Sequence, residues 1–244
     1  MKRLIVFAAL TCVSAFASAQ YASIYQNIGS NVGGTSTYQA NFVNGSADTT
    51  AITRMVADDI TFAPGSAGAI VTRFYWTVVN TDATTAINAR MRLRFYDSNG
   101  TDGGPGTYLT GYSYNPATFA ANTITTYNSV NAAGLLTVPT SGKIWAAITF
   151  DNAGGATATQ AQLNSLGQGV FNTPSIGSSS DSFFITTNPG SFLASNPAGS
   201  ITNFSGNPVA NFGWQFDITP VPEPATLAAL GLGAVALIRK RRRN

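Results

Sequence analysis

Few side chains in this sequence could carry catalytic chemistry. The 244 residues contain no histidine and one cysteine, Cys12, and Glu223 is the only glutamate. Ser-His-Asp and Cys-His sites therefore lack their base, and a histidine-rich zinc site lacks its ligands. A hydrolase would have to use two of the nine aspartates, and no spacing singles out a pair. The sequence predicts a protein without enzymatic activity, and an aspartate-dependent secreted hydrolase is the weakest alternative.

One polar stretch offers oxygen ligands at close spacing. Asp97, Asn99 and Asp102 lie in a run that also contains four glycines up to Gly106. Calcium binds six to eight such oxygens, at about 2.3–2.6 Å. The spacing does not match an EF-hand loop, and Asp, Asn and Gly also dominate ordinary turns. A weak calcium site and a simple turn that joins two strands are both open.

Three cations and two aromatic residues are candidates for contact with a glycan. Arg90, Arg92 and Arg94 alternate along one expected strand, about 6.6–7 Å apart, and could bind an anionic polysaccharide. Tyr75 and Trp145 are expected to point away from the core, where they could stack on sugar rings. The alternatives are arginines paired with aspartates of neighbouring strands, and aromatic rings buried under a loop or a second sheet.

The strands that would position these residues show a period of two. In Ala89–Asp97, Ala89, Met91, Leu93 and Phe95 share the face that is expected to meet the core, and the arginines share the face that is expected to meet solvent. Ile144, Ala146, Ile148 and Phe150 are likewise expected to face inward in Lys143–Asp151. Ile70–Asn80 is rich in β-branched and aromatic residues and is joined to Ala89–Asp97 by a short polar turn. This pattern predicts a hairpin of the two strands.

The whole body, residues 20–219, is expected to be all-β. Short strands separated by Pro, Gly, Ser and Asn predict an antiparallel β-sandwich, either jelly-roll-like or immunoglobulin-like. One short helical turn is expected within residues 154–167. The further strands are expected at Tyr38–Val43, Ile60–Phe62, Tyr108–Tyr112, Thr123–Asn128, Leu135–Val138, Val170–Phe171, Phe183–Thr187 and Phe212–Ile218, and within Met55–Phe62 a turn at Asp58 and Asp59 is expected to lead into its strand.

The first 19 residues have the features of a cleavable signal peptide. Lys2 and Arg3 precede an apolar run, and Ala17 and Ala19 form an A-x-A site before Gln20. We expect export through the Sec translocon and cleavage by signal peptidase before Gln20.

Residues 220–244 carry a second targeting pattern. Pro222, Glu223 and Pro224 precede an apolar stretch at 225–238 and a basic cluster made of Arg239, Lys240, Arg241, Arg242 and Arg243. A helix over 225–238 is about 21 Å long, shorter than the roughly 30 Å hydrocarbon core of a bilayer. Flanking cations can extend its reach and should stay on the cytoplasmic side. This predicts a short transmembrane helix and a temporary anchor, whereas the alternative is a buried or amphipathic C-terminal helix.

This tail resembles the PEP-CTERM sorting signal of exopolysaccharide-producing Gram-negative bacteria, which is also called an ice-binding-protein C-terminal domain. The resemblance covers about 24 residues and implies recognition of Pro222, Glu223 and Pro224 by an exosortase-type membrane protease. It further implies removal of the helix and release to the cell surface or extracellular matrix, after transient anchoring in the inner membrane.

Net charge separates the ends from the body. Seven of the 13 basic residues lie in the two ends, so residues 20–220 hold six cations against nine aspartates. The body is therefore mildly acidic, and its net charge gives no electrostatic reason to expect a nucleic-acid partner. The sequence indicates no cofactor. It predicts an exported surface or matrix protein that is structural or adhesive in an exopolysaccharide matrix, with a carbohydrate-binding module as the alternative.

Overall fold

Runs of β-branched and aromatic residues form the strands of this chain. The computed structural model describes residues 21–28, 37–46, 50–130, 136–188, 194–206 and 209–219. The chain divides into Ser23–Ile218 and a second unit made of its two ends, Met1–Ala22 and Thr219–Asn244. Both targeting segments predicted above, residues 1–19 and 220–244, lie outside the described residues. Among those described, no helix has the length and apolar character needed to cross a membrane.

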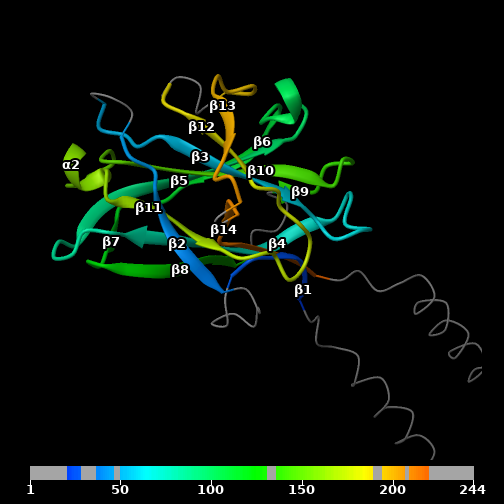
Figure 1. Ribbon diagram of the computed structural model, residues 1–244, viewed down its shortest axis with the longest axis horizontal. Helices are drawn as coiled ribbons and strands as arrows, with labels where there is room; N and C mark the ends of the chain where they lie inside the picture. The colour runs from blue at the N-terminus through cyan, green and yellow to red at the C-terminus, as the bar shows by residue number, and fades with distance from the viewer. Residues whose placement is uncertain are drawn as a thin grey trace, which may run out of the picture. The chain divides into compact units, whose positions relative to one another are not determined.

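Two antiparallel sheets make up the body, and Figure 1 shows them as two layers. The eight-stranded sheet contains β1 (Ala22–Gln26), β2 (Tyr38–Val43), β4 (Ile70–Asn80), β8 (Thr123–Val130), β9 (Leu136–Thr137), β11 (Leu166–Phe171), β14 (Asn211–Phe212) and β15 (Trp214–Ile218). The seven-stranded sheet contains β3 (Met55–Thr61), β5 (Ile87–Asp97), β6 (Tyr108–Ser113), β7 (Ala117–Phe119), β10 (Lys143–Asp151), β12 (Ser182–Thr186) and β13 (Ser200–Asn203). The prediction of an all-β body with antiparallel sheets is confirmed, and the choice between a jelly-roll-like and an immunoglobulin-like type stays a prediction.

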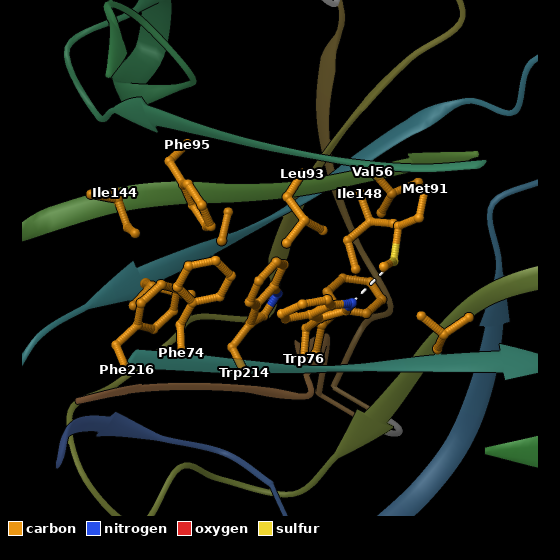
Figure 2. Packing of buried hydrophobic residues seen from close by; sticks show 14 of the residues in the cluster. Val56, Phe74, Trp76, Met91, Leu93, Phe95, Ile144, Ile148, Trp214 and Phe216 are labelled. Carbon is orange, nitrogen blue, oxygen red and sulfur yellow. Dashed lines mark hydrogen bonds between the residues drawn. The ribbon is translucent and has the colours of Figure 1, made fainter. Parts of the chain in front are cut away.

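The inner faces of the two sheets share one hydrophobic core, drawn in Figure 2. Phe95 of the seven-stranded sheet packs edge-on against Phe74 and Phe216 of the other sheet, with ring centroids 5.5 and 5.8 Å apart. Edge-to-face pairs bring the positive edge of one ring to the negative face of the next. Beside them, Nε1 of Trp76 donates to the sulfur of Met91 at 3.0 Å, so the indole N–H has a partner inside the core.

The period-two predictions for the inner face are confirmed. The four inward residues predicted for β5 are all buried, and so are the four predicted for β10: Ala89, Met91, Leu93, Phe95, Ile144, Ala146, Ile148 and Phe150. The two strands are neighbours, with Ile148 opposite Leu93. The short helix α2 (Gln160–Leu163) lies in the segment predicted for it and begins with a capping box between Thr159 and Gln162.

The predicted hairpin of Ile70–Asn80 with Ala89–Asp97 is wrong. β4 pairs with strands of the eight-stranded sheet, whereas β5 pairs with β10, β6 and β7 in the other sheet. The connection therefore crosses from one layer to the other. The amide of Asn80 donates to the carbonyls of Thr85 and Phe119 at 2.9 and 3.0 Å, and Asp82 accepts from the backbone of Thr84 and Thr85. These bonds shape a crossover that hydrophobic patterning alone does not distinguish from a hairpin.

Three strands were not predicted: β1, β7 and β13. The turn predicted at Asp58 and Asp59 is wrong, because β3 continues through both residues and pairs there with β10. All four residues of β13, from Ser200 to Asn203, are exposed. Neither face of the strand is buried, so no period-two pattern of apolar residues marks it. β13 is instead held by its pairing with β12, in which Phe184 lies opposite Ile201. Whether a short edge strand of this kind forms depends on its tertiary pairing, which the local sequence does not reveal.

Candidate functional site

The sorting residues Pro222, Glu223 and Pro224 lie outside the described residues, as do Ala17, Ala19, Gln20 and the basic cluster at 239–243. What the structure describes is the strand that leads to the tail. β15 ends at Ile218, and Trp214 and Phe216 anchor it in the core with no exposed surface. The folded body therefore continues to within four residues of Pro222.

Asp217 fixes the end of β15. Its side chain is fully buried, and Arg73 of β4 reaches its Oδ2 through Nε at 2.7 Å and Nη2 at 2.6 Å. On the other oxygen, Oδ1 accepts from the hydroxyl of Ser23 at 2.7 Å and from Nε2 of Gln215 at 2.9 Å. Charge-assisted bonds of this kind are stronger than neutral ones. We call this group of four residues the Asp217 clamp; it ties β1, β4 and β15 together where the chain enters and leaves the body.

Two of the three strand arginines form ion pairs. Arg90 binds the carboxylate of Asp151 through Nε at 2.8 Å and Nη2 at 3.2 Å, and Nε of Arg92 reaches the same carboxylate at 2.5 Å. Asp151 lies directly opposite Arg90 on β10. The interpretation in which these arginines pair with an aspartate of a neighbouring strand is confirmed for both.

Arg94 differs from its neighbours because it is buried. Its side chain lies on the expected outer face, yet the residue is only 7% exposed. Its Nη1 donates to the carbonyls of Leu93 and Tyr112 at 2.7 and 3.0 Å, and within the described part of the chain no carboxylate pairs with it. Burial lowers the pKa of this guanidinium. The expectation that Arg94 faces solvent is wrong.

Trp145 does not offer an exposed ring for sugar stacking. It is 3% exposed and belongs to a second apolar cluster on the outer face of the seven-stranded sheet, with Tyr96, Met55 and Phe184. Its Nε1 donates to the carbonyl of Gly103 at 2.9 Å. The indole is therefore committed to packing and to holding a turn, which overturns the glycan-contact prediction for this residue.

Tyr75 lies on the opposite outer face from the arginines. Its neighbours Phe74 and Trp76 point into the core, so Tyr75 points outward from the eight-stranded sheet. It is half-buried, and the guanidinium of Arg73 lies 5.2 Å from the centre of its ring. Tyr75, Trp145 and Arg90, Arg92 and Arg94 thus do not form one contact surface, and that version of the carbohydrate-binding hypothesis fails.

The Asp97–Asp102 stretch is a turn closed by its own side chains. The amide of Asn99 donates to Thr107 Oγ1 at 3.0 Å, and its Oδ1 accepts from the backbone N–H of Thr107 at 2.7 Å. Asp97 Oδ1 accepts from the N–H of Ser98. Asp102 is exposed, with φ of 53°. No group of three or more His, Cys, Asp or Glu side chains among the described residues could hold a metal ion. The geometry favours the turn interpretation, because both atoms of the Asn99 carboxamide form hydrogen bonds with Thr107 across the loop.

Within the part of the chain that the structure describes, Asp58 and Asp59 share a hydroxyl group, but Asp58 is enclosed. The hydroxyl of Ser179 donates to Asp58 at 3.0 Å and lies 3.3 Å from Asp59. Asp58 is fully buried, and burial, followed by the charge of Asp59, raises its pKa well above the usual value. The backbone N–H of Phe212 donates to its second oxygen at 3.1 Å. A carboxyl enclosed in this way cannot reach a substrate, so the pair does not support the hydrolase alternative.

A cleft that the sequence did not reveal lies between two segments far apart in the chain. Its volume is about 490 Å³. Residues of the turn Thr101–Pro105 line one side and Asn196–Ile201 line the other, and Phe184, which is only 4% exposed, also borders the cleft. Only the three-dimensional pairing of β12 with β13, and of the 194–196 segment with Gly106, brings these residues together.

Comparison with known proteins assigns the tail. Residues 220–243 match the family model described as the PEP-CTERM protein-sorting motif. No curated protein and no solved structure matches the chain. The match coincides with the Pro-Glu-Pro triplet, the apolar stretch and the basic cluster, and it begins two residues after the end of β15. The chain therefore carries a PEP-CTERM protein-sorting motif at residues 220–243.

Proposed function

We propose that this chain is an exported, non-enzymatic surface or extracellular-matrix protein that is sorted and processed through its PEP-CTERM tail. The observation that carries the proposal is the match over residues 220–243, because that motif implies an exported protein processed by an exosortase. The finer role is a structural or adhesive one in an exopolysaccharide matrix. Sec translocon, signal peptidase and an exosortase-type membrane protease are the proposed partners, and the inner membrane holds the precursor transiently.

The body supports this proposal through the position of its last strand. Three residues, 219–221, separate Ile218 from Pro222. Even a fully extended chain spans at most about 3.6 Å per residue, so Pro222 is within about 14 Å of the end of β15. The Asp217 clamp fixes that end. Cleavage at the sorting triplet would therefore leave every described strand intact.

The non-enzymatic part of the proposal is supported by the chemistry of the described residues. The mature body has neither histidine nor cysteine to serve as base or nucleophile. Asp58 and Asp59 share the hydroxyl of Ser179, and Asp58 has no exposed surface.

Substitution of the sorting triplet tests the proposal. Pro222→Ala, Glu223→Ala and Pro224→Ala, combined in one variant, should leave unprocessed chain in the membrane fraction of the native host, because the recognition residues are gone. Pro220→Ala is the matched control, since it removes a nearby proline outside the triplet, and it should be released normally. Release of the triple variant into the medium at the rate of the unsubstituted chain would contradict the proposal.

A further inference from the structure

Asp58 occupies a position that the alternation of β3 assigns to the core. Val56 and Ile60, two residues away on either side, belong to the core between the sheets, and Asp58 shares their face with no exposed surface. Within the described residues, no arginine or lysine forms an ion pair with Asp58 or with its neighbour Asp59. A buried carboxylate without a partner is unfavourable, so this one must be neutralised by a proton or by a bound cation.

Polar groups from three other segments lie around this carboxylate. The hydroxyl of Ser179 donates to Asp58 Oδ1 at 3.0 Å and lies 3.3 Å from Asp59 Oδ1, so one hydroxyl spans both acids. The backbone N–H of Phe212 donates to Asp58 Oδ2, and its carbonyl accepts from Nδ2 of Asn27, both at 3.1 Å. The N–H and C=O of one strand residue point to the same side. The carboxamide of Asn27 and the carboxylate of Asp58 therefore lie side by side.

Two fully buried side chains beside the carboxyls have oxygens without a hydrogen bond. Among the described residues, neither the hydroxyl of Tyr25 nor Oδ1 of Asn27 has a partner of normal geometry. Burial, and then the charges of Asp58 and Asp59, raise the pKa of Tyr25, which places its hydroxyl close to both acids. We call Tyr25, Asn27, Asp58, Asp59 and Ser179 the Asp58 cluster. Because buried polar atoms are almost always paired, these two oxygens point to a ligand that binds oxygen.

The loop at residues 175–180 closes over the cluster. Thr61 of β3 and Ser178 of the loop exchange backbone hydrogen bonds of 2.8 and 2.9 Å. A Cβ atom at Gly177 would come within 2.9 Å of the Tyr25 ring, so the loop backbone lies directly on this side chain of β1. A ligand in the cluster would thus join β1, β3 and the loop, which are far apart in the sequence.

The oxygens of the Asp58 cluster suit a hard divalent cation. Its two carboxylates can carry two negative charges, and two hydroxyls and one carboxamide oxygen add neutral ligands. Calcium binds six to eight oxygens in flexible geometry, whereas magnesium requires a near-ideal octahedron. Residues 20–220 contain no cysteine or histidine, so softer metals lack their usual ligands. A single proton, by contrast, neutralises one acid but cannot serve both unpaired oxygens.

We propose that the Asp58 cluster binds one calcium ion, which stabilises the junction of β1, β3 and the loop at residues 175–180. This site is separate from the Asp97–Asp102 turn, where Asn99 is engaged with Thr107. The sequence did not suggest it, because its residues come from distant segments. It is also independent of the sorting proposal, since metal binding is measured regardless of how the tail is processed.

Metal content and thermal stability of the purified full chain test the site. The chain is stripped with EDTA in mild denaturant and returned to native buffer with CaCl2, MgCl2 or EDTA, because an enclosed site exchanges slowly. Elemental analysis after gel filtration should find one calcium per chain. Calcium at about 100 times its dissociation constant should raise the thermal midpoint by roughly 5–10 °C, and magnesium by much less. A chain that retains no calcium and unfolds at the same temperature in CaCl2 and EDTA would overturn the proposal and leave a proton as the neutralising partner.

Variants locate the ion. Asp58→Asn keeps the shape of the side chain but removes its charge. In EDTA at neutral pH it should be at least as stable as the original chain, because an unpaired buried charge is gone, whereas the calcium-dependent rise of the midpoint should be lost. Tyr25→Phe removes only the unpaired hydroxyl and should fold normally in EDTA but bind calcium about tenfold more weakly.

Asp102→Asn is the matched control, since it changes an exposed acid of the Asp97–Asp102 turn. It should keep the full response to calcium. An undiminished response in a folded Asp58→Asn variant, or loss of the response in Asp102→Asn, would place the ion elsewhere and overturn the assignment.

Discussion

The indole N–H of Trp145 donates a hydrogen bond to the carbonyl oxygen of Gly103 at 2.9 Å. This bond joins the middle of the seven-stranded sheet to the turn that follows β5, across 42 residues of sequence. It explains why a tryptophan stands on the outer face of a strand. The ring packs on Phe184 with centroids 6.4 Å apart and at the same time supports one wall of the cleft.

Trp145→Phe should destabilise the body and loosen this turn. Phenylalanine retains much of the packing against Phe184 but cannot donate to Gly103. The loss of one hydrogen bond costs about 0.5–1.5 kcal/mol, and the smaller ring adds to this loss. Urea unfolding measures the change, and amide hydrogen exchange of residues 101–104 should become faster. A variant with unchanged stability and unchanged exchange would show that the bond does not hold the turn.

Asp217→Ala should destabilise the body by about 2–3 kcal/mol. The substitution leaves Arg73 without its carboxylate and Ser23 and Gln215 without their acceptor, and breaking a buried ion pair costs about 3–5 kcal/mol. The estimate is reduced because the Arg73 side chain is 24% exposed and can be solvated in part.

Asp102→Asn is the control for this measurement. It changes an aspartate that is exposed and forms no ion pair within the described residues, so its free energy of unfolding should stay within about 0.5 kcal/mol of the original. Equal effects of the two substitutions would contradict the role of the Asp217 clamp.

Asp58 should make the stability of the body depend on pH. Burial first, and then the charge of Asp59, raises the pKa of Asp58 well above its ordinary value of 3.8, and Tyr25 also lies close enough to feel both carboxyls. A raised pKa in the folded state stabilises the protein fully below the unfolded value, and this contribution is lost as pH rises through the folded value. Asp58→Asn, which is uncharged at every pH, should therefore gain stability relative to the original chain as pH rises above about 4.

Asp82→Asn provides a contrast of opposite sign. Hydrogen bonds from the backbone of Thr84 and Thr85 lower the pKa of Asp82, so its contribution is present above the unfolded pKa and is lost as pH falls through the folded value. Chemical unfolding from pH 2 to pH 7 compares the two variants with the original chain. Parallel stability curves for Asp58→Asn and the original chain would rule out the buried carboxyl as a source of pH dependence.

The inner face of the body could be predicted from sequence because alternation reports which residues share a face. Leu93 and Phe95 on β5, and Ile148 and Phe150 on β10, are buried as the pattern requires. The same alternation says nothing about whether the other face is covered. Arg94 and Trp145 lie on that other face and are nevertheless buried, and Trp145 packs there in one cluster with Phe184, Ile52 and Tyr108.

Pairing between strands and between loops could not be predicted from local patterns. A polar connection such as 81–86 is compatible with a crossover between sheets and with a hairpin. The pairing partners of β4 and β5 could therefore not be predicted from it. The cleft depends on the hydrogen bond between Asn196 and Gly106, and no local signal in either segment indicates the other. The turn around Asn99 is the exception, since Asn and Gly at that spacing favour the closure observed.

The intact mass of the protein recovered from the culture medium tests the central claim most directly. The account predicts a chain that begins at Gln20 and ends near Pro222–Pro224, so that residues 1–19 and the apolar stretch at 225–238 are both missing. Any glycan would add mass, and enzymatic deglycosylation before the measurement removes that contribution. An extracellular form that still carries Ile238–Asn244 would contradict processing through the PEP-CTERM motif.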